Sequence, residues 1–197
     1  LRETVFHIRD AAPEVPVILD AKRGDIGNTN EAYAEAVFGY LSVDAITMYP
    51  YLGREALQPM LAHSDKGILV LCRTSNAGAG EFQDLEVEGK PLYQVVAQHV
   101  ATDWNTNGNC GLVVGATYPD ELAAVRKIAP DLPILIPGVG AQDGDLAKSV
   151  AAGKDARGAG MIIAASRSII FAADGADFAE AAREKAAEHA GNFMFNR

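Results

Sequence analysis

A lysine between two aspartates is the pattern in this chain with the clearest chemical meaning. Asp20, Lys22 and Asp25 follow directly on the apolar run 15–19 (VPVIL), which is typical of a buried parallel strand. Side chains alternate along a strand, so we expect Asp20 and Lys22 to point to the same side, with Asp25 beyond the strand end. The flanking carboxylates favour the protonated lysine, which argues against a Schiff base because imine formation needs the free amine.

A solvated cluster of ion pairs is the alternative interpretation, since this spacing of common residues often arises by chance. Two features favour a functional site. Charges at the carboxyl end of a strand in an α/β barrel usually serve chemistry rather than stability. Gly24 and Gly27 also allow the backbone to come close to whatever binds there.

The last two strand ends indicate a phosphate site. Residues 137–142 (PGVGAQ) follow one apolar run, and residues 165–168 (ASRS) follow the next. Barrel enzymes often bind a substrate phosphate at the seventh and eighth strands, using backbone N–H groups at the start of a helix. The guanidinium of Arg167 suits a phosphate group. The alternative is that Gly138 and Gly140 are turn residues and Arg167 is a surface residue.

These motifs need a scaffold of alternating strands and helices. The expected strands are 15–19, 45–48, 67–72, 109–114, 133–136 and 161–164. The expected helices are 1–12, 31–41, 53–63, 91–105 (with Pro91 in its first turn), 119–128, 143–152 and 177–188. Polar, glycine-rich segments follow nearly every strand, which favours a barrel with one mouth over a doubly wound sheet. The long polar loop 73–90 is interpreted as a mobile lid, or alternatively as an ordinary surface excursion.

Composition excludes several classes of protein. The chain has 197 residues and a formal net charge of −9, which argues against a general nucleic-acid binder. No apolar run approaches the roughly 20 residues that span a membrane, and we expect no signal peptide. Cys72 and Cys110 lie in apolar runs, which predicts buried thiols and a cytoplasmic, reducing location. No Cys/His cluster has metal-site spacing, and we expect the four histidines at the surface or at helix ends.

Four motifs together resemble the orotidine 5'-phosphate decarboxylase family, in the form of its bacterial subgroup. They are residues 20–29 (DAKRGDIGNT), 74–76 (TSN), 137–142 (PGVGAQ) and 166–169 (SRSI), and the resemblance runs from residue 15 to about 173. It implies a (β/α)8 TIM barrel and a homodimer with its sites at the subunit interface. It also implies decarboxylation of orotidine 5'-monophosphate to uridine 5'-monophosphate, the last step of de novo pyrimidine biosynthesis, without a metal or organic cofactor.

The resemblance also assigns roles to residues of the first motif. Lys22 corresponds to the proton donor of the family, and Asp20 to the carboxylate beside the substrate carboxylate. Asp25 and Thr29 correspond to residues that reach the site of the neighbouring subunit.

In the other motifs the resemblance assigns binding roles. Ser75 corresponds to the serine that contacts the pyrimidine. Pro137 precedes the phosphate loop, which contains Gly138 and Gly140. Gln142 and Arg167 correspond to the phosphate ligands of the family.

One departure from the family concerns the first two βα units. If residues 137–142 and 165–168 follow strands seven and eight, the strand that ends at Asp20 is the third. We therefore expect residues 1–197 to be a single barrel domain, N-terminally truncated, made of units 3 to 8 after the second helix. The family's aspartate and lysine from the absent strands have no counterpart here.

Two other functions remain open. A magnesium-dependent sugar-phosphate decarboxylase or aldolase of the same barrel superfamily shares the Asp-x-Lys-x-x-Asp strand, but Thr29, Ser75 and Gln142 argue against it. A non-catalytic nucleotide-binding fragment is the second alternative, because part of the family's site is absent.

Overall fold

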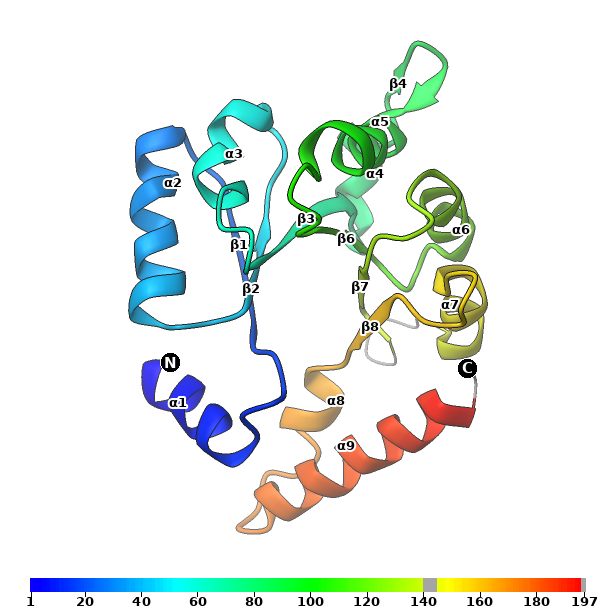
Figure 1. Cartoon of the computed structure of the whole chain (residues 1–197). Helices are drawn as coiled ribbons and strands as arrows, with labels where there is room; N and C mark the ends of the chain where they lie inside the picture. The colour runs from blue at the N-terminus through cyan, green and yellow to red at the C-terminus, as the bar shows by residue number, and fades with distance from the viewer. Residues whose placement is uncertain (140–144, 196–197) are drawn as a thin grey trace. The chain divides into compact units, whose positions relative to one another are not determined.

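The computed structural model of the chain describes residues 1–139 and 145–195. The chain forms two compact units (Figure 1). The first holds Leu1–Cys72 and Val96–Leu112, and the second holds Arg73–Val95 and Val113–Arg197. That residues 1–197 make one barrel domain stays a prediction.

Parallel strands form the centre of each unit. They are β1 (Ile18–Arg23), β2 (Ala45–Met48), β3 (Gly67–Arg73), β6 (Cys110–Val114), β7 (Ile134–Pro137) and β8 (Met161–Ala164). Their order is β1-β2-β3-β6 in the first unit, and β6 is followed by β7 and β8 in the second. β1 pairs in parallel with β2, β2 with β3, and β7 with β8. This pattern confirms the predicted α/β class.

Helices connect these strands. The α-helices are α1 (Arg2–Ala11), α2 (Gly27–Ala34), α3 (Gly53–Leu61), α4 (Gly80–Gln83), α5 (Leu92–His99), α6 (Pro119–Ile128), α7 (Leu146–Gly153), α8 (Arg167–Ile170) and α9 (Phe178–Phe195). The other elements are the π-helices η1 (Glu35–Tyr40) and η3 (Val100–Trp104), the 3-10 turn η2 (Ala77–Ala79), and the hairpin of β4 (Glu86–Val87) and β5 (Lys90–Pro91). Among the described residues, no helix is both long enough and apolar enough to cross a membrane.

Apolar side chains of β2 and α3 form part of the core of the first unit. All four residues of β2 are buried, as expected for a parallel strand that is covered on both faces. Ile46, Met48, Leu57 and Met60 are each at most 1% exposed. The buried Asn30 of α2 donates from Nδ2 to the carbonyl of Ala56 at 2.6 Å, which holds α2 against α3 (Figure 1).

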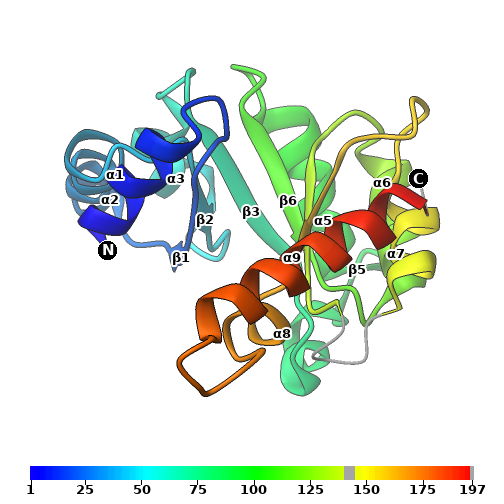
Figure 2. The same ribbon diagram turned by 90° about the horizontal axis from the view of Figure 1, so that it is seen from below.

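In the second unit, α6 packs against α7 and α8 packs against α9, and both pairs lie side by side in two views (Figures 1 and 2). Gly153 allows α7 to lie close to β7, because a Cβ on Gly153 would lie only 2.8 Å from Ile136 Cδ1. The buried guanidinium of Arg126 joins the loops around these elements. It donates at 2.7–3.2 Å to the carbonyls of Ala129, Pro130, Leu132, Gly153 and Gly160.

The structure corrects several predicted boundaries. The strand predicted over 15–19 begins at Ile18 and continues to Arg23, since Pro16 has no N–H to donate to a neighbouring strand. The helix predicted over 31–41 begins at Gly27 and ends in η1. Pro91 lies in β5 rather than in a helix, because the chain first closes a hairpin in which Leu92 N donates to Leu85 O at 2.8 Å.

Two C-terminal helices also differ from their predicted ranges. In the helix predicted over 143–152, residue 143 lies outside the described residues. The observed α7 starts at Leu146, where the Asp145 side chain accepts the Lys148 N–H as an N-cap. The helix predicted over 177–188 extends to Phe195.

Candidate functional site

Asp20 and Lys22 meet at the carboxyl end of β1. The Lys22 ammonium donates to Asp20 Oδ1 at 2.6 Å, and the two side chains are 42% and 55% exposed. They therefore lie on the same side of the chain, as predicted. The contact forms although β1 is irregular here: Lys22 has a φ of 48°, in the left-handed region that non-glycine residues rarely adopt.

Thr47 of β2 is a site residue that sequence reasoning missed. Its side chain is completely buried. Its Oγ1 donates to Asp20 Oδ1 at 2.9 Å and accepts the Lys22 N–H at 2.9 Å. The sequence does carry a signal for Thr47: it is the only hydroxyl residue in the apolar strand 45–48, and a buried hydroxyl needs a polar partner.

Asp25 and Thr29 lie where the chain turns into α2, as predicted. The Asp25 carboxylate accepts the Ile26 N–H at 2.8 Å, and the Asp25 carbonyl accepts from Asn30 Nδ2 at 2.7 Å. Thr29 is half-buried in the first turn of the helix. Within the described part of the chain, Asp25 makes no ion pair with Lys22, so the structure joins Asp20 and Lys22 but not Asp25.

Ser75 belongs to the second unit and packs closely on Gly115. A Cβ on Gly115 would lie 2.6 Å from the Ser75 Cβ and 2.9 Å from its nitrogen. The adjacent Thr74 N–H donates to Gln83 Oε1 at 2.8 Å, which fastens the start of the loop to α4. Only a residue without a side chain fits beside Ser75 at this position.

The loop 73–90 is structured along much of its length. It contains η2, α4 and the β4–β5 hairpin. The buried Arg73 forms an ion pair with Asp84 at 3.0 Å, and its guanidinium lies 3.9 Å from the centre of the Tyr118 ring. Whether this loop acts as a mobile lid stays a prediction.

The predicted phosphate ligands lie after β7 and β8. Gly138 has a φ of 94°, which a residue with a side chain rarely adopts, and the Pro137 carbonyl accepts the Ala116 N–H at 2.9 Å. Arg167 is the first residue of α8 and is exposed. Gly140 and Gln142 lie outside the described residues, so the structure gives the position of part of this motif.

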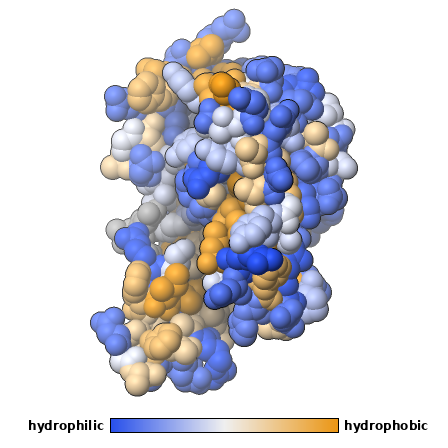
Figure 3. All heavy atoms as spheres, turned by 90° about the vertical axis from the view of Figure 1, so that its left-hand side faces the viewer, coloured by the Kyte–Doolittle hydropathy of each residue, from blue (hydrophilic) through white to orange (hydrophobic). Residues whose placement is uncertain are grey.

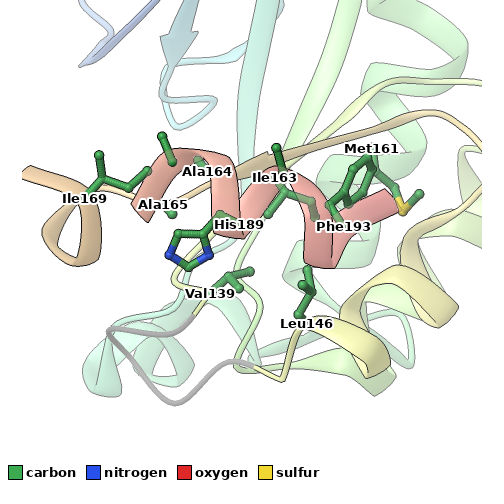
Figure 4. Close-up of a pocket in the computed structure, with 11 residues that line it drawn as sticks. Val139, Leu146, Met161, Ile163, Ala164, Ala165, Ile169, His189 and Phe193 are labelled. Carbon is green, nitrogen blue, oxygen red and sulfur yellow. The ribbon is translucent and has the colours of Figure 1, made fainter. Parts of the chain in front are cut away.

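An apolar pocket of about 390 Å³ lies beside Val139 and Ala165 (Figure 4). Its walls come from α7, β8, α8 and α9. His189 lines the pocket, and its Nε2 lies 3.0 Å from Ser168 Oγ. His189 is half-buried and lies within α9 rather than at its end, because the helix continues past its predicted end at 188 to Phe195.

Both cysteines are free and buried, as predicted. Burial raises the pKa of the Cys110 thiol to about 11, so this group is protonated at neutral pH. Among the described residues, no group of three or more His, Cys, Asp or Glu side chains is close enough together to hold a metal ion.

Comparison with known proteins extends these observations to a family. The family model described as "Orotidine 5'-phosphate decarboxylase / HUMPS family" matches residues 2–182. The orotidine 5'-phosphate decarboxylase of Ralstonia pickettii is 55% identical over 186 residues, which cover 94% of this chain and 69% of that protein. The decarboxylase of Cupriavidus metallidurans is also 55% identical, with 94% and 68% covered. The chain thus spans about two thirds of the length of these relatives.

Solved structures agree with the sequence matches. Leishmania donovani OMP decarboxylase superposes with a TM-score of 0.83 and 44% identity, over 98% of this chain and 75% of that one. Leishmania donovani UMP synthase gives a TM-score of 0.84 and 48% identity, over 93% of this chain and 40% of that one. These matches confirm the predicted TIM-barrel class, of which this chain contains part. The chain therefore belongs to the orotidine 5'-phosphate decarboxylase family, the carboxy-lyases of UMP biosynthesis.

Proposed function

We propose that the protein decarboxylates orotidine 5'-monophosphate to uridine 5'-monophosphate, with Lys22 as the proton donor. The observation that carries this proposal is the Lys22–Asp20 contact of 2.6 Å at the carboxyl end of β1, in a chain of this family. When the bond between C6 of the pyrimidine ring and the substrate carboxylate breaks, CO2 leaves and the electron pair of that bond stays on C6. A fixed ammonium stabilises that charge and then gives its proton to C6, and the lysine regains a proton from water.

Asp20 has two roles in this proposal. It holds the Lys22 ammonium through a charge-assisted hydrogen bond. In the reaction it lies beside the substrate carboxylate, and the repulsion between the two negative charges is relieved as CO2 leaves.

Phosphate binding is assigned to Arg167 and to the residues after β7, with Ser75 at the pyrimidine. Arg167 is an exposed residue at the start of α8, and Gly138 turns the chain with a positive φ. Binding energy from a phosphate distant from C6 lowers the barrier when it orders the groups that act at C6. No metal or organic cofactor enters this proposal.

The protein is also proposed to act as a homodimer, with Asp25 and Thr29 in the site of the neighbouring subunit. Large apolar side chains are exposed directly after Asp25 and in the turn between β2 and α3, which supports a protein interface. Ile26, Tyr51 and Leu52 are 58%, 86% and 51% exposed. On the face drawn in Figure 3, apolar side chains reach the surface at several places among hydrophilic ones. Exposed apolar patches commonly mark sites of protein association.

The test is the change in ultraviolet absorbance of orotidine 5'-monophosphate with the full-length gene product. We expect turnover that survives a chelator and that falls at least about 10³-fold in Lys22→Ala. Lys66→Ala is the matched control, because Lys66 also lies next to an aspartate, Asp65, but before β3 rather than after a strand. A folded wild type without turnover refutes the proposal. Turnover of a sugar phosphate that stops on chelation supports the magnesium-dependent relatives, and substrate binding without turnover supports a binding protein.

A further inference from the structure

We propose that Thr47 is a positioning residue for the proton donor, an inference that rests on the proposed function of Lys22. The Thr47 hydroxyl links the backbone of Lys22 to the side chain of Asp20. It accepts the Lys22 N–H at 2.9 Å and donates to Asp20 Oδ1 at 2.9 Å. Because a backbone N–H only donates and a carboxylate only accepts, the direction of both bonds is fixed.

The pairing of β1 with β2 explains why a hydroxyl is needed. Leu19 lies opposite Ile46 and Arg23 opposite Met48, so three residues of β1 lie opposite the single residue Thr47. Such a bulge takes backbone groups out of the regular ladder of hydrogen bonds. The Lys22 N–H is one of these groups, and the Thr47 side chain supplies its acceptor.

The conformation of Lys22 shows what this contact holds. Its φ of 48° is unfavourable for a residue with a Cβ and persists only where surrounding contacts determine it. Asp20 Oδ1 receives both the Thr47 hydroxyl and the Lys22 ammonium. One buried group therefore fixes the lysine at two points: directly at its backbone, and through Asp20 at its ammonium.

Burial makes Thr47 suited to this role. The residue is completely buried, and both neighbours in β2, Ile46 and Met48, are fully buried as well. Because the Thr47 side chain is itself completely buried, it has little room to change rotamer and its hydroxyl is closed to bulk water. Removal of the hydroxyl leaves the Lys22 N–H and one Asp20 lone pair without their partner.

Two matched pairs of side chains test the role. Wild-type Thr47 and Thr47→Val differ by the hydroxyl at nearly constant volume, and Thr47→Ser and Thr47→Ala differ by the hydroxyl in a smaller side chain. For the full-length gene product we expect kcat to fall about 10²-fold in the valine variant, because an error of about 1 Å in a reacting group costs about that much. We expect KM to stay within about threefold and the serine variant to keep kcat within about threefold of wild type.

A purely structural role predicts a different result, in which thermal stability falls but kcat per folded enzyme is the same with and without the hydroxyl. That result overturns the inference. If the valine variant does not fold, the comparison of Thr47→Ala with Thr47→Ser decides the question in the same way.

A readout that does not use activity separates this inference from the proposed function. Hydrogen exchange at the Lys22 amide, followed by NMR, is expected to be slow in wild type and in Thr47→Ser and faster in Thr47→Val and Thr47→Ala. Equal protection in all four proteins refutes the positioning role even if the enzyme is active. If wild type does not turn over orotidine 5'-monophosphate, the proposed function fails, and the exchange data still decide whether Thr47 holds Lys22.

Discussion

Replacing Gly115 with alanine tests whether Ser75 must be held in place. Gly115 directly follows β6, and its N–H donates to the Arg73 carbonyl at 2.8 Å. A Cβ at this position would lie 2.6 Å from the Ser75 Cβ, 2.8 Å from its Cα and 2.9 Å from its nitrogen. Two of these three atoms are backbone, so Ser75 is unable to avoid the methyl group by changing rotamer.

The distances give the size of the effect. Ordinary van der Waals contact begins at 3.4 Å, so the closest contact falls about 0.8 Å short. Ser75 must move by about that much, and a misplacement near 1 Å costs about 10²-fold in rate. Overpacking of this kind also lowers the free energy of unfolding by about 1–3 kcal/mol.

The assay is kcat/KM for orotidine 5'-monophosphate, with urea unfolding of the same preparations. Gly78→Ala is the control, since Gly78 lies in the same loop and a Cβ there meets no atom nearer than Asn76 Nδ2 at 3.9 Å. We expect the control to stay within about threefold of wild type. If Gly115→Ala loses stability and yet keeps kcat/KM within that range, Ser75 does not act at the pyrimidine.

Two further predictions concern stability of the second unit. Arg126→Met leaves the three buried carbonyls of Ala129, Leu132 and Gly153 without the Arg126 donor. It should lower the free energy of unfolding by at least about 3 kcal/mol more than Lys127→Met, an exposed control that removes the same charge from the same helix turn. Equal urea midpoints for the two variants would contradict this. Hydrogen bonds from the Ala159 N–H and from Arg157 lower the pKa of Asp155 to about 2, from an ordinary value of 3.8. Because its folded-state pKa is depressed, its contribution to stability is present above about pH 4 and is lost as the pH falls toward 2. Asp155→Asn should therefore flatten the pH dependence of urea unfolding between pH 4 and pH 2, and an unchanged slope would show that other carboxylates dominate.

Elements with strong local signals were predicted well from the sequence. β2 and β8 match their predicted ranges because each is a short apolar run. α6 also matches its predicted range, Pro119–Ile128. It begins with proline, carries acidic residues in its first turn and basic residues in its last turn, and these signals mark helix ends without help from the rest of the fold.

Elements whose local signals are weak or conflicting were not predicted. Pro91 is a favourable first residue for a helix, but it pairs with Glu86 in the β4–β5 hairpin, and the helix starts at the next residue. The chain from 35 to 40 carries no local signal for a π-helix. For the candidate site, the sequence indicated Asp20 and Lys22 but not Thr47, because a hydroxyl finds its partners across strands and the register of β1 against β2 is not a local property.

The unfavourable backbone conformation of Lys22, which departs from that of a regular strand, is informative about function. A regular strand through this residue would give its N–H a carbonyl partner and would remove a strained φ that costs about 1–3 kcal/mol. The same change would separate the Lys22 backbone from the Thr47 hydroxyl and move the ammonium relative to Asp20. A chain selected for stability alone has no reason to keep the irregular form. A chain that must deliver one proton to one carbon atom does, because its rate depends on where the ammonium lies. The irregular segment of β1 is therefore the position at which we expect substitutions to exchange activity for stability.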